Sequence, residues 1–242
     1  MTSSLYVIGD IHGEITMLET ALDRIATDGG TDAPMISLGD LVDRGPGSSA
    51  VIETLLQGKA AGRDWTVLKG NHDRMFQRFL EDGRVHDPRV VSGVDWLNPR
   101  LGGDKTLNAY GVDTDPARPV THMLQDARAA VPAAHLAFLR DMPLFHQAQG
   151  MLFVHAGIVP GVPLADQAED DLLWIRGPFL DHTEAHPWLV VHGHTALEAA
   201  AHCGNRINLD SGAGYGRPLT VAVFEAGEVW TLEPDGRRRL GP

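Results

Sequence analysis

The sequence predicts a mixed α/β fold, and three observations carry that prediction. Short apolar runs rich in branched residues alternate with amphipathic helical patterns through the first 70 residues, which is typical of parallel strands joined by helices. After residue 200 the helical patterns give way to successive short strands separated by glycine turns, which indicates a second, more antiparallel sheet. No clear linker interrupts the 242 residues, so we expect one domain spanning 1–242.

Five apolar runs are predicted to be buried strands because each is short, is rich in branched or aromatic residues and is followed by a polar cluster. They lie at 5–8, 35–38, 65–68, 151–154 and 188–191. Helices are expected at 14–26 and 48–58, where apolar side chains recur on one stripe, and Gly58 is placed to end the second helix. This order of strand, helix and strand favours parallel pairing in the first half of the chain.

The segment 82–122 has many turn-forming residues and weak periodicity, so we expect an insertion over the core that acts as a lid. A helical pattern follows at 126–140, where Pro132 must break the helix or start a new one. Further strands are expected at 206–209, 219–224 and 229–232.

The composition argues against several classes of protein. The formal net charge is −12, whereas a protein that binds nucleic-acid phosphates presents a basic face, so we expect no nucleic-acid partner. The single cysteine, Cys203, cannot form an intrachain disulfide, which fits a reducing compartment. The sequence shows neither a signal-peptide pattern nor an apolar run of about 18 residues. We therefore expect a cytoplasmic protein with no membrane partner, and a monomer by default.

Polar side chains follow each of the first five predicted strands. They are Asp10, His12, Asp40, Asn71, His155 and His194. If these strands run parallel, their carboxyl ends meet on one side of the fold, where ligands collect in open α/β sheets. Two aspartates, an asparagine and three histidines suit a site for two divalent metal ions, and imidazole with carboxylate favours zinc, iron or manganese over calcium.

The stretch GDLVDRG at 39–45 places two aspartates and an arginine in one tight turn. Clustered carboxylates repel and raise one another's pKa, and bound cations relieve that repulsion. Asp40 could therefore bridge two metal ions. Arg44 can hold a phosphate oxygen by a charge-assisted hydrogen bond, and Asp43 can orient a histidine that transfers a proton.

Five motifs together resemble one known family, the calcineurin-like metallophosphoesterases. They are GDIHG at 9–13, GDLVDRG at 39–45, GNHD at 70–73, HAG at 155–157 and GHT at 193–195. Their order and spacing are most similar to the phosphoprotein phosphatase branch, including its bacterial and phage members, and the resemblance covers roughly residues 5 to 225. It implies a β-sandwich of two mixed sheets flanked by helices, with a dinuclear metal site at the strand ends.

The resemblance also implies roles for ten residues. Asp10 and His12 would bind the first metal ion, with Asp40 bridging to the second, and the second ion would be completed by Asn71, His155 and His194. The remaining four would be His72 as general acid, Asp43 as the residue that holds it, and Arg44 and Arg176 as phosphate-binding residues.

The resemblance implies two divalent metal ions as cofactors, with manganese as the first expectation and iron or zinc as alternatives. They would lower the pKa of a bridging water, and the hydroxide would attack phosphorus directly, in line with the leaving group. No covalent phosphoenzyme would then be needed.

The sequence pattern is compatible with three functions. The first is a serine/threonine protein phosphatase, acting on a phosphorylated protein or a small phosphorylated substrate. The second is a hydrolase of dinucleoside polyphosphates such as diadenosine tetraphosphate, and the third is a metal-binding scaffold without turnover. Asp43 favours the first, because symmetrical dinucleoside tetraphosphatases with this pattern often carry a small residue there. The complete ligand set and His72 argue against the scaffold.

Overall fold

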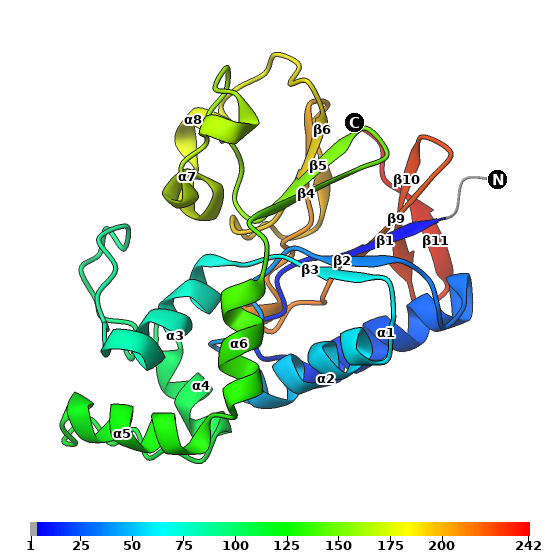
Figure 1. Cartoon of the computed structure of the whole chain (residues 1–242). Helices are drawn as coiled ribbons and strands as arrows, with labels where there is room; N and C mark the ends of the chain where they lie inside the picture. The colour runs from blue at the N-terminus through cyan, green and yellow to red at the C-terminus, as the bar shows by residue number, and fades with distance from the viewer. Residues whose placement is uncertain (1–3) are drawn as a thin grey trace.

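The computed structural model describes residues 4–242 as two β-sheets packed face to face, with helices on both outer sides (Figure 1). The first sheet has the order β11-β10-β9-β1-β2-β3 and the second the order β4-β5-β6-β8-β7. In the first sheet the strands are β1 (Leu5–Ile8), β2 (Met35–Ser37), β3 (Trp65–Val67), β9 (Val221–Glu225), β10 (Glu228–Glu233) and β11 (Gly236–Arg239). In the second they are β4 (Phe145–Ala148), β5 (Met151–Val154), β6 (Leu189–His192), β7 (Ala201–His202) and β8 (Arg206–Asn208). The mixed α/β sandwich expected from the sequence is confirmed.

Parallel pairing brings the carboxyl ends of several strands to the same edge of each sheet. In the first sheet β2 runs parallel to both β1 and β3, and in the second sheet β6 runs parallel to both β5 and β8. The expected strands at 5–8, 35–38, 65–68, 151–154 and 188–191 all form, within a residue or two of the predicted bounds. The parallel pairing predicted for the first half of the chain is therefore confirmed.

The expectation of a separate antiparallel sheet after residue 200 is wrong. Strands β9 and β10 join the first sheet, because β9 pairs antiparallel with β1, while β8 joins the second sheet parallel to β6. The physical reason is burial on both faces of β9. Ala222 and Phe224 face the second sheet, whereas Val221 and Val223 face the helices. Such a strand stabilises the fold most when it lies inside a sheet.

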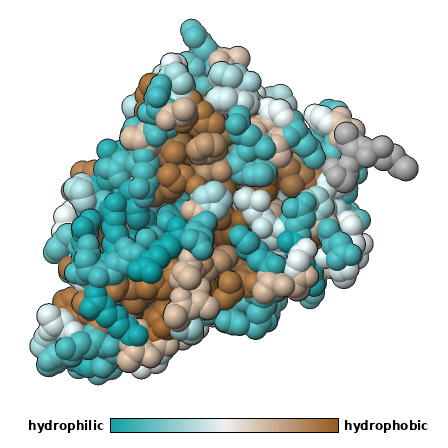
Figure 2. Space-filling model, in the orientation of Figure 1, coloured by the Kyte–Doolittle hydropathy of each residue, from teal (hydrophilic) through white to brown (hydrophobic). Residues whose placement is uncertain are grey.

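The helices form the outer layers. They are α1 (Ile15–Gly29), α2 (Ser48–Ala60), α3 (Asn71–Asp82), α4 (Gly103–Ala109), α5 (Val120–Ala130), α6 (Ala133–Asp141), α7 (Glu169–Trp174) and α8 (Gly177–Leu180). Figure 1 shows α1 to α6 on the outer side of the first sheet, and α7 and α8 beside the second sheet. On the face shown in Figure 2, hydrophilic residues predominate and hydrophobic residues gather in patches over the middle.

Two of the helix predictions are confirmed with shifted ends. Helices α1 and α2 form where expected, and Pro132 separates α5 from α6. Gly58 does not end α2 but lies inside it, where a Cβ would collide with the indole of Trp65. Helix α3 was not expected. It begins directly after the third strand, where the Asp73 carboxylate accepts the backbone N–H of Gly70 at 2.8 Å.

The segment 82–122 is partly packed into the core. The Trp96 side chain is only 1% exposed, and its ring stacks on Phe76 of α3 with 5.7 Å between ring centroids. That this segment covers the substrate as a lid stays a prediction. Within residues 4–242 no helix is both long and apolar enough to cross a lipid bilayer.

Candidate active site

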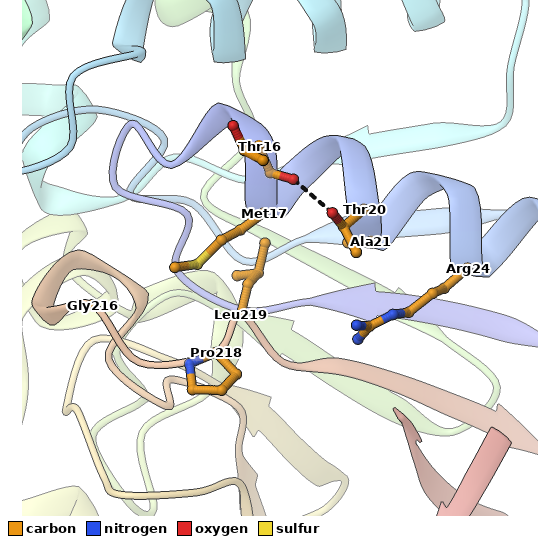
Figure 3. Close-up of a pocket in the computed structure, with 8 residues that line it drawn as sticks. All are labelled: Thr16, Met17, Thr20, Ala21, Arg24, Gly216, Pro218 and Leu219. Carbon is orange, nitrogen blue, oxygen red and sulfur yellow. Dashed lines mark hydrogen bonds between the residues drawn. The ribbon is translucent and has the colours of Figure 1, made fainter. Parts of the chain in front are cut away.

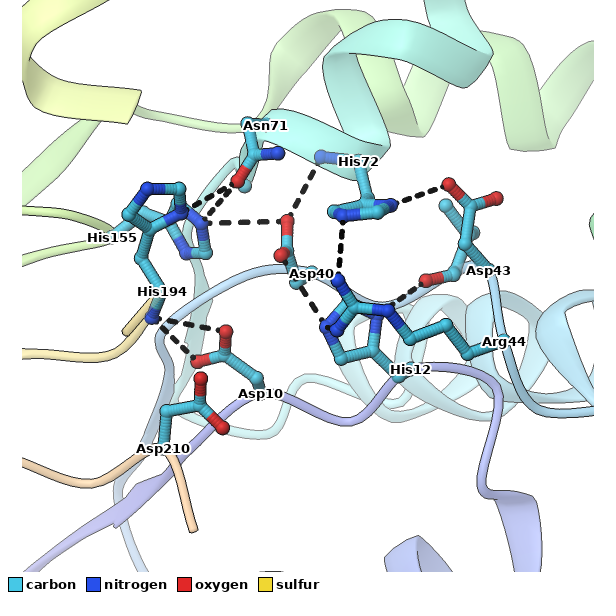
Figure 4. A network of polar contacts seen from close by, with 12 residues as sticks. Asp10, His12, Asp40, Asp43, Arg44, Asn71, His72, His155, His194 and Asp210 are labelled. Atoms are coloured by element: carbon cyan, nitrogen blue, oxygen red, sulfur yellow. Dashed lines mark hydrogen bonds and ion pairs between the residues drawn. The ribbon is translucent and has the colours of Figure 1, made fainter. Parts of the chain in front are cut away.

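A cluster of polar side chains lies where the carboxyl ends of the parallel strands of both sheets meet (Figure 4). The residues follow β1, β2, β3, β5 and β6 in the chain, and they are Asp10, His12, Asp40, Asp43, Arg44, Asn71, His72, His155 and His194. Arg176, at the start of α8, reaches the same cluster through a hydrogen bond to the carbonyl of His194 at 3.4 Å. The structure thus brings together all ten residues singled out in the sequence.

The backbone of this cluster is held in an unusual conformation. Five of its non-glycine residues have positive φ angles: His12, Asp40, Asp43, Arg44 and His194. A left-handed conformation costs a side-chain-bearing residue on the order of 1–3 kcal/mol, and such residues concentrate at functional sites. The strained backbone at these residues therefore lowers the stability of the fold, and it directs their side chains into the cluster.

One half of the cluster forms around Asn71, His155 and His194. The Asn71 Oδ1 atom lies 2.9 Å from His155 Nε2 and 2.9 Å from His194 Nδ1. His155 Nδ1 lies 2.9 Å from the carbonyl oxygen of Leu38 and donates its proton there, so Nε2 presents a lone pair to the Asn71 oxygen. Two acceptors this close repel unless a proton or a cation lies between them. This half is therefore suited to a metal ion.

The other half forms around His12, whose ring is oriented in the same way. Its Nδ1 donates to the carbonyl oxygen of Val42 at 2.9 Å, which leaves the Nε2 lone pair directed into the cluster. That Nε2 atom lies 3.5 Å from Asp40 Oδ2 and 2.5 Å from Arg44 Nη1. In the structure the Arg44 guanidinium thus places its positive charge at the atom through which His12 would bind a metal ion.

Asp40 connects the two halves through its two carboxylate oxygens. Oδ2 faces His12, while Oδ1 lies 3.4 Å from His155 Nε2 and accepts the backbone N–H of His72 at 2.9 Å. Asp40 is 2% exposed, so its charge needs compensation from within the protein. This position is what a carboxylate shared by two cations requires.

Among residues 4–242, two groups of side chains could each hold a cation, with ligand atoms within 4.8 Å of one another. They are His12, Asp40 and His72, and Asp40, His155 and His194. His194 Nε2 is also buried without a hydrogen-bond partner. The donor set of imidazole and carboxylate suits manganese, iron or zinc. The first group contains His72 where we expected Asp10, so the assignment of Asp10 to the first metal ion stays a prediction.

Asp10 lies at the edge of the cluster beside a second carboxylate. Its oxygens accept the backbone N–H of His194 at 3.0 and 3.3 Å. Burial, and then the negative charges of Asp210 and Asp40, raise the pKa of Asp10. Figure 4 shows Asp210 next to Asp10. A cation at this edge would relieve the repulsion between these carboxylates.

Asp210 was missed in the sequence analysis. It lies two residues beyond β8, at the same end of the second sheet as His194, and is 3% exposed. The available signal was its position after an apolar strand. We expected that strand in a separate antiparallel sheet, and so did not place its end beside the other strand ends.

His72 and Asp43 form a buried pair. His72 Nδ1 donates to Asp43 Oδ2 at 2.6 Å, so Nε2 faces the site and lies 3.2 Å from Arg44 Nη2. Burial lowers the pKa of His72, because the imidazolium loses its hydration. A negatively charged group next to the ring would oppose that effect and favour a proton on Nε2.

Two residues of the segment 82–122 hold Asp43 from behind, and the sequence analysis missed both. Trp96 Nε1 donates to Asp43 Oδ2 at 2.7 Å, and Thr106 Oγ1 donates to Oδ1 at 2.6 Å. Burial raises the pKa of Asp43 to about 7, and the donors Thr106 and Trp96 oppose this rise. Nothing in the local pattern around Trp96 or Thr106 indicates contact with a residue more than 50 positions away.

An open cavity leads to the cluster. It has a volume of about 440 Å³, and its lining residues are Arg44, Arg176, His194, Thr195, Ala196, Asp210, Tyr215 and Arg217. A separate cavity of about 280 Å³ lies between α1 and residues 216–219 (Figure 3). The lining of this second cavity includes no carboxylate or imidazole, so of these two cavities the first has the chemistry of a reaction site.

Comparisons with known proteins agree on one family, in which the similar proteins have two different named activities. The family described as calcineurin-like phosphoesterase matches residues 3–223. Serine/threonine-protein phosphatase 1 of Salmonella typhimurium is 26% identical over 233 residues, which span 91% of this chain and 92% of that protein. The symmetrical bis(5'-nucleosyl)-tetraphosphatase of Ralstonia nicotianae is 30% identical over 164 residues, which span 68% of this chain but only 45% of that protein.

A solved structure extends the similarity to the fold. The cold-active protein-tyrosine phosphatase of a psychrophilic Shewanella has a TM-score of 0.66 and 18% identity, and the match covers 99% of this chain and 80% of that one. At this identity the likeness concerns the fold alone.

Asp40→Asn is expected to weaken metal binding by at least about tenfold, because both candidate metal groups lose their shared charge. Asparagine tolerates the left-handed backbone of this position, so the fold should persist. The measurement is the manganese content after dialysis against a series of free metal concentrations. Asp28→Asn, which removes a carboxylate paired with Arg237 away from the site, is the control. An Asp40→Asn protein that stays fully metal-loaded and active would contradict the bridging role.

Trp96→Phe is expected to lower the free energy of unfolding by about 1.5–3 kcal/mol, because the buried Asp43 carboxylate loses one of its donors. The measurement is urea unfolding followed by circular dichroism. Trp65→Phe removes the same atoms from a partly buried indole whose Nε1 makes no such bond, and serves as the matched control. Equal losses in the two variants would show that the bond to Asp43 contributes nothing to stability.

Proposed function

The chain belongs to the calcineurin-like phosphoesterase family and is a metallophosphatase, and from this premise we propose that it removes phosphate from phosphoserine and phosphothreonine in proteins. The observation that carries the proposal is the buried hydrogen bond of 2.6 Å between His72 and Asp43. This bond holds a histidine with Nε2 directed into the site, within 3.2 Å of Arg44 Nη2 and beside the candidate metal ligands. The relative from Salmonella typhimurium, which the alignment covers almost completely, supports the same activity.

The residues around Asp40 would hold two divalent metal ions, with Asp40 shared between them. Asp10 and His12 would complete one ion, and the other would be completed by Asn71, His155 and His194. When bound, the ions supply a water of lowered pKa and neutralise charge on the phosphate oxygens. The ring nitrogens of His12 and His155 that donate to backbone carbonyls fix the rings in the orientation that presents Nε2 to a metal ion.

Arg44 and Arg176 would bind the phosphate oxygens that face away from the metal ions. Both line the open cavity, and Arg44 also contacts the His72 ring, so a bound phosphate would lie close to the candidate acid. A planar guanidinium matches the geometry of two phosphate oxygens, which orients the phosphorus for attack.

His72 would protonate the leaving oxygen from Nε2. Asp43 holds the ring through Nδ1, so the imidazole cannot turn away from the substrate. The hydrogen bond to the Asp43 carboxylate would also stabilise the protonated ring until the proton is transferred. Trp96 and Thr106 keep Asp43 in place, so the segment 82–122 contributes to this step through its packing.

A second candidate function is the hydrolysis of dinucleoside polyphosphates. It is favoured by the similarity to a symmetrical tetraphosphatase and by a third arginine, Arg217, in the open cavity. A chain of several phosphates carries more negative charge than a phosphorylated side chain and could use an additional cation.

His72→Asn is expected to reduce turnover by roughly two to four orders of magnitude without lowering the metal content, because the variant lacks the proton donor. The measurement is the steady-state rate of the manganese-loaded protein with aryl phosphates of increasing leaving-group acidity. The loss should shrink as the leaving group improves, since a good leaving group needs no proton. An equal loss for all aryl phosphates would show that His72 is not the acid.

Direct competition between two substrates tests the proposed function. The manganese-loaded protein is offered a phosphothreonine peptide and diadenosine tetraphosphate, with His72→Asn as the control. We expect the larger kcat/KM for the peptide. A larger value for diadenosine tetraphosphate would overturn the protein phosphatase proposal in favour of the second candidate.

A further inference from the structure

Arg217 is the one guanidinium of the open cavity to which the proposed reaction gives no role. Three guanidiniums line this cavity of about 440 Å³, from Arg44, Arg176 and Arg217. The first two suffice to hold one phosphate. Asp210 is the single carboxylate among the lining residues. The cavity therefore has more positive charge than the scissile phosphate requires.

The surroundings of Arg217 leave its charge available. Within residues 4–242, no side chain pairs or hydrogen bonds with its guanidinium, and its Nε atom is buried without a hydrogen-bond partner. The guanidinium carbon of Arg217 lies 5.8 Å from the centroid of the Tyr215 ring. A partly buried donor without a partner costs free energy that an arriving anion would recover.

The loop after β8 is shaped to accommodate two arginines. A Cβ at Gly212 would collide with the guanidinium of Arg217, and a Cβ at Gly214 would lie 2.8 Å from Cδ of Arg44. Gly212 also has a φ of +81°, which a residue with a side chain adopts only with strain. The two glycines thus leave the space that both arginines occupy.

Tyr215 contacts both of these arginines. Its ring centroid is 4.7 Å from the guanidinium carbon of Arg44 and 5.8 Å from that of Arg217, so both cations lie against one aromatic ring. Tyr215 is 60% exposed and lines the open cavity, so its ring is accessible to a ligand there. Arg217 therefore lies near Arg44, which would hold the scissile phosphate, and supplies a separate cation in the same cavity.

We propose that Arg217, presented by Tyr215 and Gly212, binds a second phosphate group of the substrate beside the scissile phosphate. The proposal rests on the proposed function, since it uses Arg44 and Arg176 for the scissile phosphate. The ligand chemistry is a phosphate that carries at least one negative charge within reach of the guanidinium. Such a phosphate comes from the next unit of a polyphosphate chain or from a second phosphorylated residue in the same peptide.

The test compares substrates that differ in the number of phosphates. Wild-type and Arg217→Ala proteins, both loaded with manganese, are assayed with p-nitrophenyl phosphate, with a peptide carrying one or two neighbouring phosphothreonines, and with diadenosine tetraphosphate. We expect Arg217→Ala to lower the ratio of kcat/KM for a two-phosphate substrate to that for a one-phosphate substrate by about tenfold, mainly through KM. Arg24→Ala, which removes a cation from the cavity on the other side of the same loop, should leave this ratio unchanged.

The pattern of losses identifies the source of the second phosphate. A fall confined to diadenosine tetraphosphate supports a polyphosphate chain, and a fall confined to the doubly phosphorylated peptide supports neighbouring phosphoresidues. An unchanged ratio overturns the proposal. An equal loss for all substrates, including p-nitrophenyl phosphate, also overturns it, because Arg217 would then serve the scissile phosphate or the fold of the loop.

A binding measurement separates this proposal from the proposed function. Calorimetry with methylenebisphosphonate, which cannot be hydrolysed at its bridge, and with inorganic phosphate needs no turnover. We expect wild type to bind the bisphosphonate more tightly than phosphate, and Arg217→Ala to lose about tenfold of that preference. The same preference in both proteins refutes the second phosphate site, whichever substrate the enzyme hydrolyses.

Discussion

The buried carboxylate of Asp40 is the constraint on which the site depends. One of its oxygens faces His12, which follows β1, and the other faces His155, which follows β5 of the second sheet. The same carboxylate accepts the backbone N–H of His72 and so anchors the start of α3. A residue that joins two sheets and a helix must be placed by all three. Its left-handed backbone is tolerated because these contacts determine it together.

The burial of several carboxylates close together explains which groups surround them in the cluster. Asp10, Asp73 and Asp210 each have a raised pKa, for which burial is the main cause, with the charge of Asp40 adding to it. Backbone N–H groups partly compensate this cost, as where Asp73 accepts from Leu41 and Gly70. Cations compensate the remaining cost of burying these carboxylates. Arg44 lies inside the cluster for this reason, and the same excess of acceptors suits the site to divalent metal ions.

Two segments without a recognisable motif complete the site. The segment 82–122 supplies Trp96 and Thr106, which hold the carboxylate that orients His72. The loop after β8 supplies Tyr215 and Arg217, which line the open cavity together with Arg44 and Arg176. The candidate metal ligands follow closely after strands of the two sheets, whereas these residues come from longer connecting segments. A scaffold of this kind keeps the phosphate chemistry fixed while the loops adapt the enzyme to a substrate.

The sequence by itself determined the local features: the five strands with their polar ends, helices α1 and α2, the break at Pro132 and the ten clustered side chains. These follow from apolar periodicity and from short motifs, both of which operate over a few residues. Three features were decided only by the tertiary structure: the pairing of β9 with β1 in the first sheet, the position of Asp210 beside Asp10, and the contact of Trp96 with Asp43. Each of these depends on contacts between residues far apart in the chain. Such contacts are selected by the burial of whole surfaces, which no local pattern records.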